Sequence, residues 1–111
     1  MRDIEQYISN ELFKKKIDLD SFGINEYAWN PEDIMMVLKE LENRKIGVLG
    51  GDVYKIAENI IEMTFDSWYI NDDNSTDYYN KSIKKAYEYI SEYEKRNNGR
   101  FIYSLVVQDC V

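Results

Sequence analysis

The residues best suited to chemistry in this sequence are carboxylates, because the 111-residue chain contains no histidine. The absence of histidine excludes Ser-His-Asp and Cys-His nucleophiles and every imidazole-based metal site. Glu62 and Asp66 could act as a carboxylate pair of the glycosidase type, since two acids on one strand face can lie about 5–9 Å apart. Nothing else in so short a sequence indicates a sugar-binding cleft. We therefore expect a protein that is not an enzyme.

Two other stretches resemble ligand-binding motifs but lack essential positions. Gly50-Gly51 has neither the Walker spacing to a Gly-Lys-Ser/Thr triplet nor the spaced glycines of a dinucleotide fingerprint. The stretch that starts at Asp72 resembles a calcium loop, but Asp77 replaces the required glycine and Ile83 replaces the glutamate at its end. We expect neither a cofactor nor a metal, and we interpret the two glycines as a bulge or a close-packing site.

Charge restricts the class of partner. The chain has 21 acidic and 14 basic residues, which gives a formal net charge of −7 at neutral pH. Residues 46–79 contain seven acidic residues and one basic residue, so the negative charge is concentrated there. Nucleic acids and anionic membranes require a positive surface and are not expected partners. A basic protein is the expected partner.

The sequence is typical of a cytoplasmic protein. Its first residues lack the basic and apolar regions of a signal peptide, and no run approaches the ~18 apolar residues of a membrane helix. The single cysteine, Cys110, cannot form an internal disulfide bond, and we interpret it as an inert residue near the end of the chain.

Hydrophobic periodicity predicts one α+β domain over residues 1–111. The expected architecture is a mainly antiparallel sheet of three to four strands with about three helices packed on one face. Asn30 and Pro31 are typical of the start of a helix. The predicted helices cover residues 4–16, 30–43 and 75–96, the predicted strands cover 46–56, 60–70 and 101–107, and a connector covers 17–30.

The two central strands are predicted to form a hairpin around a loop at residues 57–59. If this loop closes the pair Ile56–Ile60, strand alternation places Gly51 opposite Phe65, whose ring could cover the bare backbone. A bulge at Gly50-Gly51 would shift this register by one residue. One face of the hairpin would be apolar (Val53, Met63, Phe65), and the other would be exposed, acidic and aromatic (Asp52, Tyr54, Glu62, Thr64, Asp66, Trp68).

Two motifs in this hairpin resemble those of a known family. They are Ile46-Gly47-Val48-Leu49-Gly50-Gly51-Asp52-Val53-Tyr54 and Thr64-Phe65-Asp66-Ser67-Trp68-Tyr69. With the surrounding chain from about residue 20 to about residue 95, they resemble the immunity protein 40 family of bacterial polymorphic toxin systems. The resemblance implies a cytoplasmic protein that binds and neutralises a cognate toxin during contact-dependent competition between bacteria.

The resemblance and the charge distribution together suggest a binding site on the hairpin and the loop that follows it. A nuclease is the first candidate for the toxin, because such an enzyme needs basic residues to bind its substrate. Two alternatives remain: a small carboxylate-based enzyme or ligand-binding domain that uses the Gly50-Gly51 hairpin, and a regulatory module with an unrelated protein partner. The acids expected to pair with basic toxin residues are Asp52, Glu62, Asp66, Asp72 and Asp73, and the expected aromatic anchors are Tyr54 and Trp68.

Overall fold

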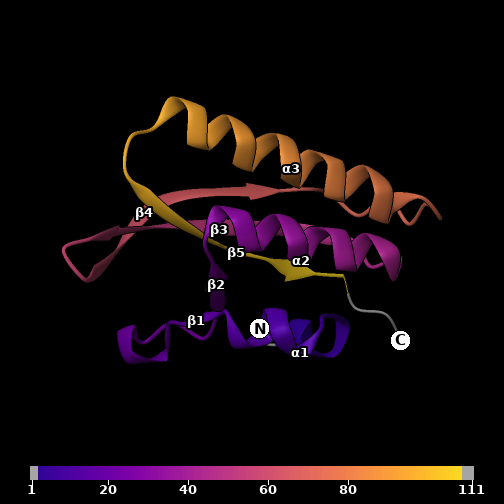
Figure 1. The fold of residues 1–111 in the computed structure, drawn as a ribbon. Helices are drawn as coiled ribbons and strands as arrows, with labels where there is room; N and C mark the ends of the chain where they lie inside the picture. Colours follow the sequence, from indigo (N-terminus) through magenta and orange to yellow (C-terminus); the bar gives the residue numbers. More distant parts are fainter. Residues whose placement is uncertain (1–2, 109–111) are drawn as a thin grey trace.

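The computed structural model describes residues 3–108, which form an antiparallel sheet covered by helices. Helices α2 (Pro31–Asn43) and α3 (Tyr78–Arg96) lie side by side on one face of this sheet (Figure 1). The predicted α+β class is therefore confirmed. No helix within these residues is both long and apolar enough to cross a membrane. Cys110 lies outside the described residues.

The sheet has six strands rather than the three to four that were predicted. The connector at residues 17–30 supplies two of the additional strands, and the predicted last strand is divided at Leu105. β5 lies inside the sheet between β2 and β3, which explains its buried apolar sequence. The strands are β1 (Ile17–Asp18), β2 (Tyr27–Trp29), β3 (Val48–Ala57), β4 (Ile60–Tyr69), β5 (Arg100–Ser104) and β6 (Val106–Val107), in the order β1-β2-β5-β3-β4, with β6 also paired to β3.

Helix α2 begins and ends where the sequence predicts. The Asn30 side-chain oxygen accepts a hydrogen bond from the Asp33 backbone N–H at 2.9 Å, and Pro31 occupies the first turn. Both features satisfy or remove backbone donors that have no partner inside the helix. The helix then buries an apolar stripe against the sheet, formed by Ile34, Val37, Leu38 and Leu41.

The predicted first helix is interrupted. It consists of a 3-10 helix, η1 (Asp3–Tyr7), and a short α-helix, α1 (Asn10–Lys14), and a further 3-10 turn, η2 (Asp20–Phe22), follows β1. Ser9 separates the first two, and its hydroxyl accepts a hydrogen bond from the Leu12 N–H at 3.3 Å as an N-cap. The Trp29 indole N–H donates to the Leu12 carbonyl at 2.9 Å, which fixes α1 to β2.

Apolar side chains pack on both faces of the sheet. The face under α2 and α3 carries the main core, which includes Trp29, Val53 and Tyr103. The opposite face carries a smaller core formed by Leu19, Ala28, Tyr54 and Ile102. The segment that contains β1 and η2 therefore covers part of the sheet that the helices leave open.

The β3–β4 hairpin turns over two residues instead of the predicted three. Glu58 and Asn59 have φ values of 50° and 68°, as a two-residue type I′ turn requires. Ala57 pairs with Ile60, so the predicted pair Ile56–Ile60 is wrong. The register near the turn is therefore shifted by one residue. Each β4 side chain near the turn faces the side of the sheet opposite to the predicted one.

A bulge in β4 changes the register a second time. Tyr54 pairs with Met63 and Asp52 pairs with Ser67, so β4 residues 64–66 lie opposite Val53 alone. This bulge lies opposite Val53 rather than at Gly50-Gly51, but a separate irregularity between Val48 and Gly50 interrupts the pairing of β3 with β6 next to the position considered from the sequence. Beyond the bulge, Gly51 faces Trp68 rather than Phe65.

Candidate partner-binding surface

β4 is an edge strand, because it pairs only with β3 among the described strands. It carries four of the six large apolar side chains that are exposed in residues 3–108. We call these four residues the β4 surface: Ile60, Met63, Phe65 and Tyr69. Apolar residues gathered on one element in this way mark an interaction site more often than scattered ones do.

The bulge presents Phe65 to solvent. Its φ of 64° lies in the left-handed region, which non-glycine residues rarely adopt, and its side chain is 87% exposed. Thr64 holds this conformation, because its hydroxyl donates to the Val53 carbonyl at 2.7 Å and accepts from the Asp66 N–H at 3.0 Å. Strained backbone of this kind is concentrated at functional positions. A bulge also stops an edge strand from pairing freely with other chains.

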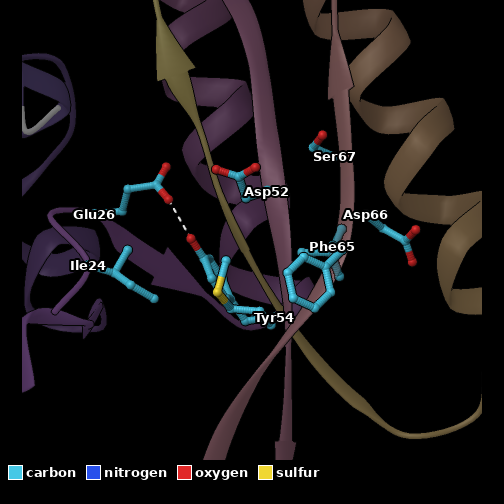
Figure 2. Close-up of a pocket in the computed structure, with 9 residues that line it drawn as sticks. Ile24, Glu26, Asp52, Tyr54, Phe65, Asp66 and Ser67 are labelled. Atoms are coloured by element: carbon cyan, nitrogen blue, oxygen red, sulfur yellow. Dashed lines mark hydrogen bonds between the residues drawn. The ribbon is translucent and has the colours of Figure 1, made fainter. Parts of the chain in front are cut away.

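Beside the β4 surface lies a pocket of about 420 Å³, which we call the acidic groove. Figure 2 shows Glu26 on one side, Asp52 and Tyr54 on the floor, and Phe65 on the side of β4. The principal lining residues are Ile24, Glu26, Asp52, Tyr54, Met63 and Phe65.

Hydrogen bonds hold Glu26 in the acidic groove. The Tyr54 hydroxyl donates to Glu26 Oε1 at 2.5 Å, and the Ser104 hydroxyl donates to Glu26 Oε2 at 2.9 Å (Figure 2). The Asp52 backbone N–H donates to the Ser104 hydroxyl at 3.2 Å. Burial and the Glu26 carboxylate raise the pKa of Tyr54, so its hydroxyl remains a donor at neutral pH.

Asp52 has the most perturbed carboxyl group in the acidic groove. Burial, the negative charge of Glu26 and a hydrogen bond to Glu26 raise its pKa from 3.8 to about 6. Each of these causes disfavours the ionised form. Because the pKa of Asp52 is higher in the folded protein than in the unfolded chain, its protonation stabilises the fold. This contribution to stability is complete below pH 3.8 and is lost as the pH rises through 6.

We expect the variant Asp52→Asn to raise the free energy of unfolding by about 1 kcal/mol at neutral pH, a value reduced for solvent screening of a partly exposed group. Near pH 3.5 most of the difference between the variant and the parent should have disappeared, because Asp52 is then mostly protonated in both states. Urea denaturation at the two pH values measures the difference. Asp73→Asn is the control and should have the opposite effect, a lower free energy of unfolding at neutral pH. The Ser75 hydroxyl is the chief cause that lowers the pKa of Asp73 to about 2, so its ionised form stabilises the fold. If Asp52→Asn raised the free energy of unfolding equally at both pH values, the raised pKa of Asp52 would be contradicted.

The predicted acidic and aromatic face is divided between two sides of the hairpin. Asp66 is turned toward α3, where the Tyr93 hydroxyl donates to its Oδ2 at 2.7 Å. Trp68 is also on this side and stacks on Tyr89 with 4.7 Å between ring centroids. Asp52 and Tyr54 lie on the opposite side, in the acidic groove, which Asp66 also lines although its carboxylate is bonded to Tyr93. The prediction of one shared face is therefore wrong, because the two-residue turn shifts the register by one residue; the bulge adds two more residues to β4 and does not reverse the faces again.

The structure also corrects the predicted exposure of three hairpin residues, Tyr54, Met63 and Phe65. Tyr54 is 3% exposed and belongs to the smaller core, whereas Met63 and Phe65 are exposed at 55% and 87%. Val53 is buried as predicted, but it does not face Met63. The exposed aromatic residue of the bulge is Phe65.

The remaining predicted site residues lie away from the acidic groove. Glu62 is exposed and opposite Lys55 in the strand register. Asp72 accepts a hydrogen bond from the Gln108 side chain at 2.8 Å, and Asp73 lies 3.5 Å from the Lys81 ammonium. Within residues 3–108, no three acidic or cysteine side chains are grouped so that they could hold a metal ion.

All four residues of the β4 surface were missed as site residues from the sequence, and so was Glu26 of the acidic groove. Glu26 comes from the segment before β2 and reaches Tyr54 only after the sheet has formed. Met63 and Phe65 were assigned to the buried face by simple alternation. The only sequence signal was the long run of apolar residues in β4, which exceeds what one buried strand face needs.

The described residues form an acidic α+β domain in which most of the exposed large apolar side chains lie on one edge strand, a distribution typical of protein-binding domains. The sequence model of the family described as Immunity protein 40 matches residues 18–107. The chain belongs to this family, as the motifs of the hairpin indicated. Searches of curated proteins and of solved structures gave no match.

Proposed function

We propose that this immunity protein neutralises a cognate toxin domain by covering the surface with which the toxin binds its substrate. The observation that carries the proposal is the β4 surface, where Phe65 is 87% exposed on an edge strand. Exposed aromatic residues supply contact area at low entropic cost, and the neighbouring acids select a basic partner. Membership of the Immunity protein 40 family supports a toxin as that partner.

The mechanism is steric and electrostatic, and it requires no catalysis. The region from residue 46 to residue 79 has a net charge of −6 and includes the exposed acids Glu62, Asp66 and Asp73. A toxin that cleaves nucleic acid carries basic residues at its substrate site, so a nuclease is the favoured target. The protein would act in the cytoplasm of the cell that produces it.

Coexpression tests the proposal. A candidate toxin domain, sought first among the genes that neighbour this one, is induced in bacterial cells with and without this protein, and growth is measured. We expect growth to be restored only when the folded protein is present, and the two purified proteins to form a complex. A complex that leaves the toxin fully active would contradict occlusion of the substrate site.

Steering by the acidic residues makes a kinetic prediction. The association rate constant should fall about tenfold or more between about 50 mM and 500 mM salt. The double variant Asp66→Asn/Asp72→Asn should lower this rate constant severalfold at low salt while changing the dissociation rate constant little. Glu5→Gln/Glu11→Gln, which removes the same charge from the N-terminal helices, is the matched control in a surface plasmon resonance measurement. An association rate that does not depend on salt would exclude steering.

A further inference from the structure

The carboxylates of the acidic groove have no cationic partner within residues 3–108. None of the ion pairs in this part of the chain includes Glu26 or Asp52. The hydroxyls of Tyr54 and Ser104 donate to Glu26, and the Asp52 carboxyl lies within hydrogen-bonding reach of it, so every neighbour that binds Glu26 here is a hydroxyl or a carboxyl group and none is a cation. Two carboxylates close to each other and partly removed from water are stabilised by any cation that enters between them.

The wall opposite Glu26 belongs to β4, where two apolar residues of the β4 surface lie beside Asp66 and Ser67. Phe65 and Met63 line the acidic groove on this side, and Ile24 lines it beside Glu26. In Figure 2 the Phe65 ring lies on the opposite side of Tyr54 from Glu26 and Ile24. The groove therefore combines an aromatic ring and aliphatic side chains with the carboxylates of Glu26 and Asp52, and Asp66 lines it as well.

We propose that the acidic groove receives an arginine side chain of the toxin. The guanidinium group would lie between Glu26 and Asp52, and its aliphatic stem would lie against Met63 and Phe65. Arginine suits this arrangement better than lysine, because its planar group binds two carboxylate oxygens and stacks on aromatic rings. The net charge of −7 favours the approach of such a residue. This inference rests on the proposed function, since it assigns one residue type of the toxin to one place on this surface.

A small probe tests the groove without the toxin. Blocked arginine (N-acetylarginine amide) is titrated into ¹⁵N-labelled protein, and blocked citrulline, its neutral counterpart, is titrated in parallel. We expect saturable shifts of the backbone resonances around Glu26, Asp52 and Phe65 with arginine but not with citrulline. Glu26→Gln and Asp52→Asn should each weaken the binding about threefold or more, whereas Glu62→Gln on the outside of the hairpin should not. The amide spectrum of each variant establishes that it is folded.

Two outcomes of this titration would overturn the inference. One is the absence of shifts in the acidic groove. The other is equal binding of arginine by the parent protein and by Glu26→Gln, which would mean that arginine only collects on an acidic surface.

The purified toxin domain separates the groove from the wider proposal. Phe65→Ala and Glu26→Gln should each weaken the toxin complex about 30-fold or more. Met36→Ala, which removes an exposed side chain from α2, should leave the affinity unchanged. If the parent protein protects cells and both groove variants bind as tightly as the parent, the groove assignment is wrong and the proposed function stands. If the parent itself does not bind the toxin, the proposed function fails, while the arginine titration still decides whether the groove takes a guanidinium group.

Discussion

Replacing Gly51 with valine should lower the free energy of unfolding by about 3 kcal/mol. A Cβ atom at this position would lie 2.1 Å from the Ser104 carbonyl oxygen and 2.4 Å from Cη2 of Trp68. The carbonyl belongs to β5 and cannot move without disturbing the centre of the sheet. Chemical denaturation followed by far-UV circular dichroism measures the loss.

Gly23→Ala is the control that separates the steric overlap expected at Gly51 from the cost of a side chain on left-handed backbone. Gly23 has a φ of 77°, and beyond its two chain neighbours no residue has an atom within 4 Å of the position that its Cβ would occupy. This variant should cost only about 1 kcal/mol, the penalty for a left-handed residue with a side chain. Equal losses for the two variants would show that Gly51 is not packed against Trp68 and Ser104.

Trp68→Ala should lower the free energy of unfolding by about 3 kcal/mol, at the lower end of the range for large core residues. Trp68 is half-buried, packs against the main core and stacks on Tyr89 of α3. Its removal would leave a cavity above Gly51 and would separate the hairpin from the helix. A urea melt monitored by circular dichroism is the appropriate measurement, because Trp29 also fluoresces.

The neighbouring variant Tyr69→Ala provides the matched comparison. Tyr69 is 76% exposed, so its removal should change the stability by less than about 0.5 kcal/mol. If Trp68 is also an anchor for the toxin, as the sequence suggested, Trp68→Phe should retain much of the packing and still weaken the complex. Full stability of Trp68→Ala would contradict the position of this side chain between the hairpin and α3.

The sequence by itself determined those features that depend on short-range interactions. Asn30 and Pro31 predict the start of α2, because a cap and a missing donor act within one helical turn. Apolar spacing predicts its buried face for the same reason. The absence of histidine and the concentration of acids also required no structure. The hairpin motifs were sufficient to indicate the family.

The tertiary structure alone decided which side chains of the hairpin face outward. Strand alternation is reliable only while the register is constant, and the turn and the bulge each change it. The bulge depends on the contacts of Thr64 with β3, which no local pattern specifies. As a result Trp68 occupies the place beside Gly51 that Phe65 was expected to fill, and Phe65 is exposed.

The acidic groove likewise exists only in the folded chain. Glu26 precedes Asp52 by 26 residues, and the two carboxylates meet because β2 and β3 both flank β5. Ser104, on β5, links the two residues through its hydroxyl. Contacts between residues so far apart depend on strand order, and strand order depends on how the whole chain buries its apolar residues.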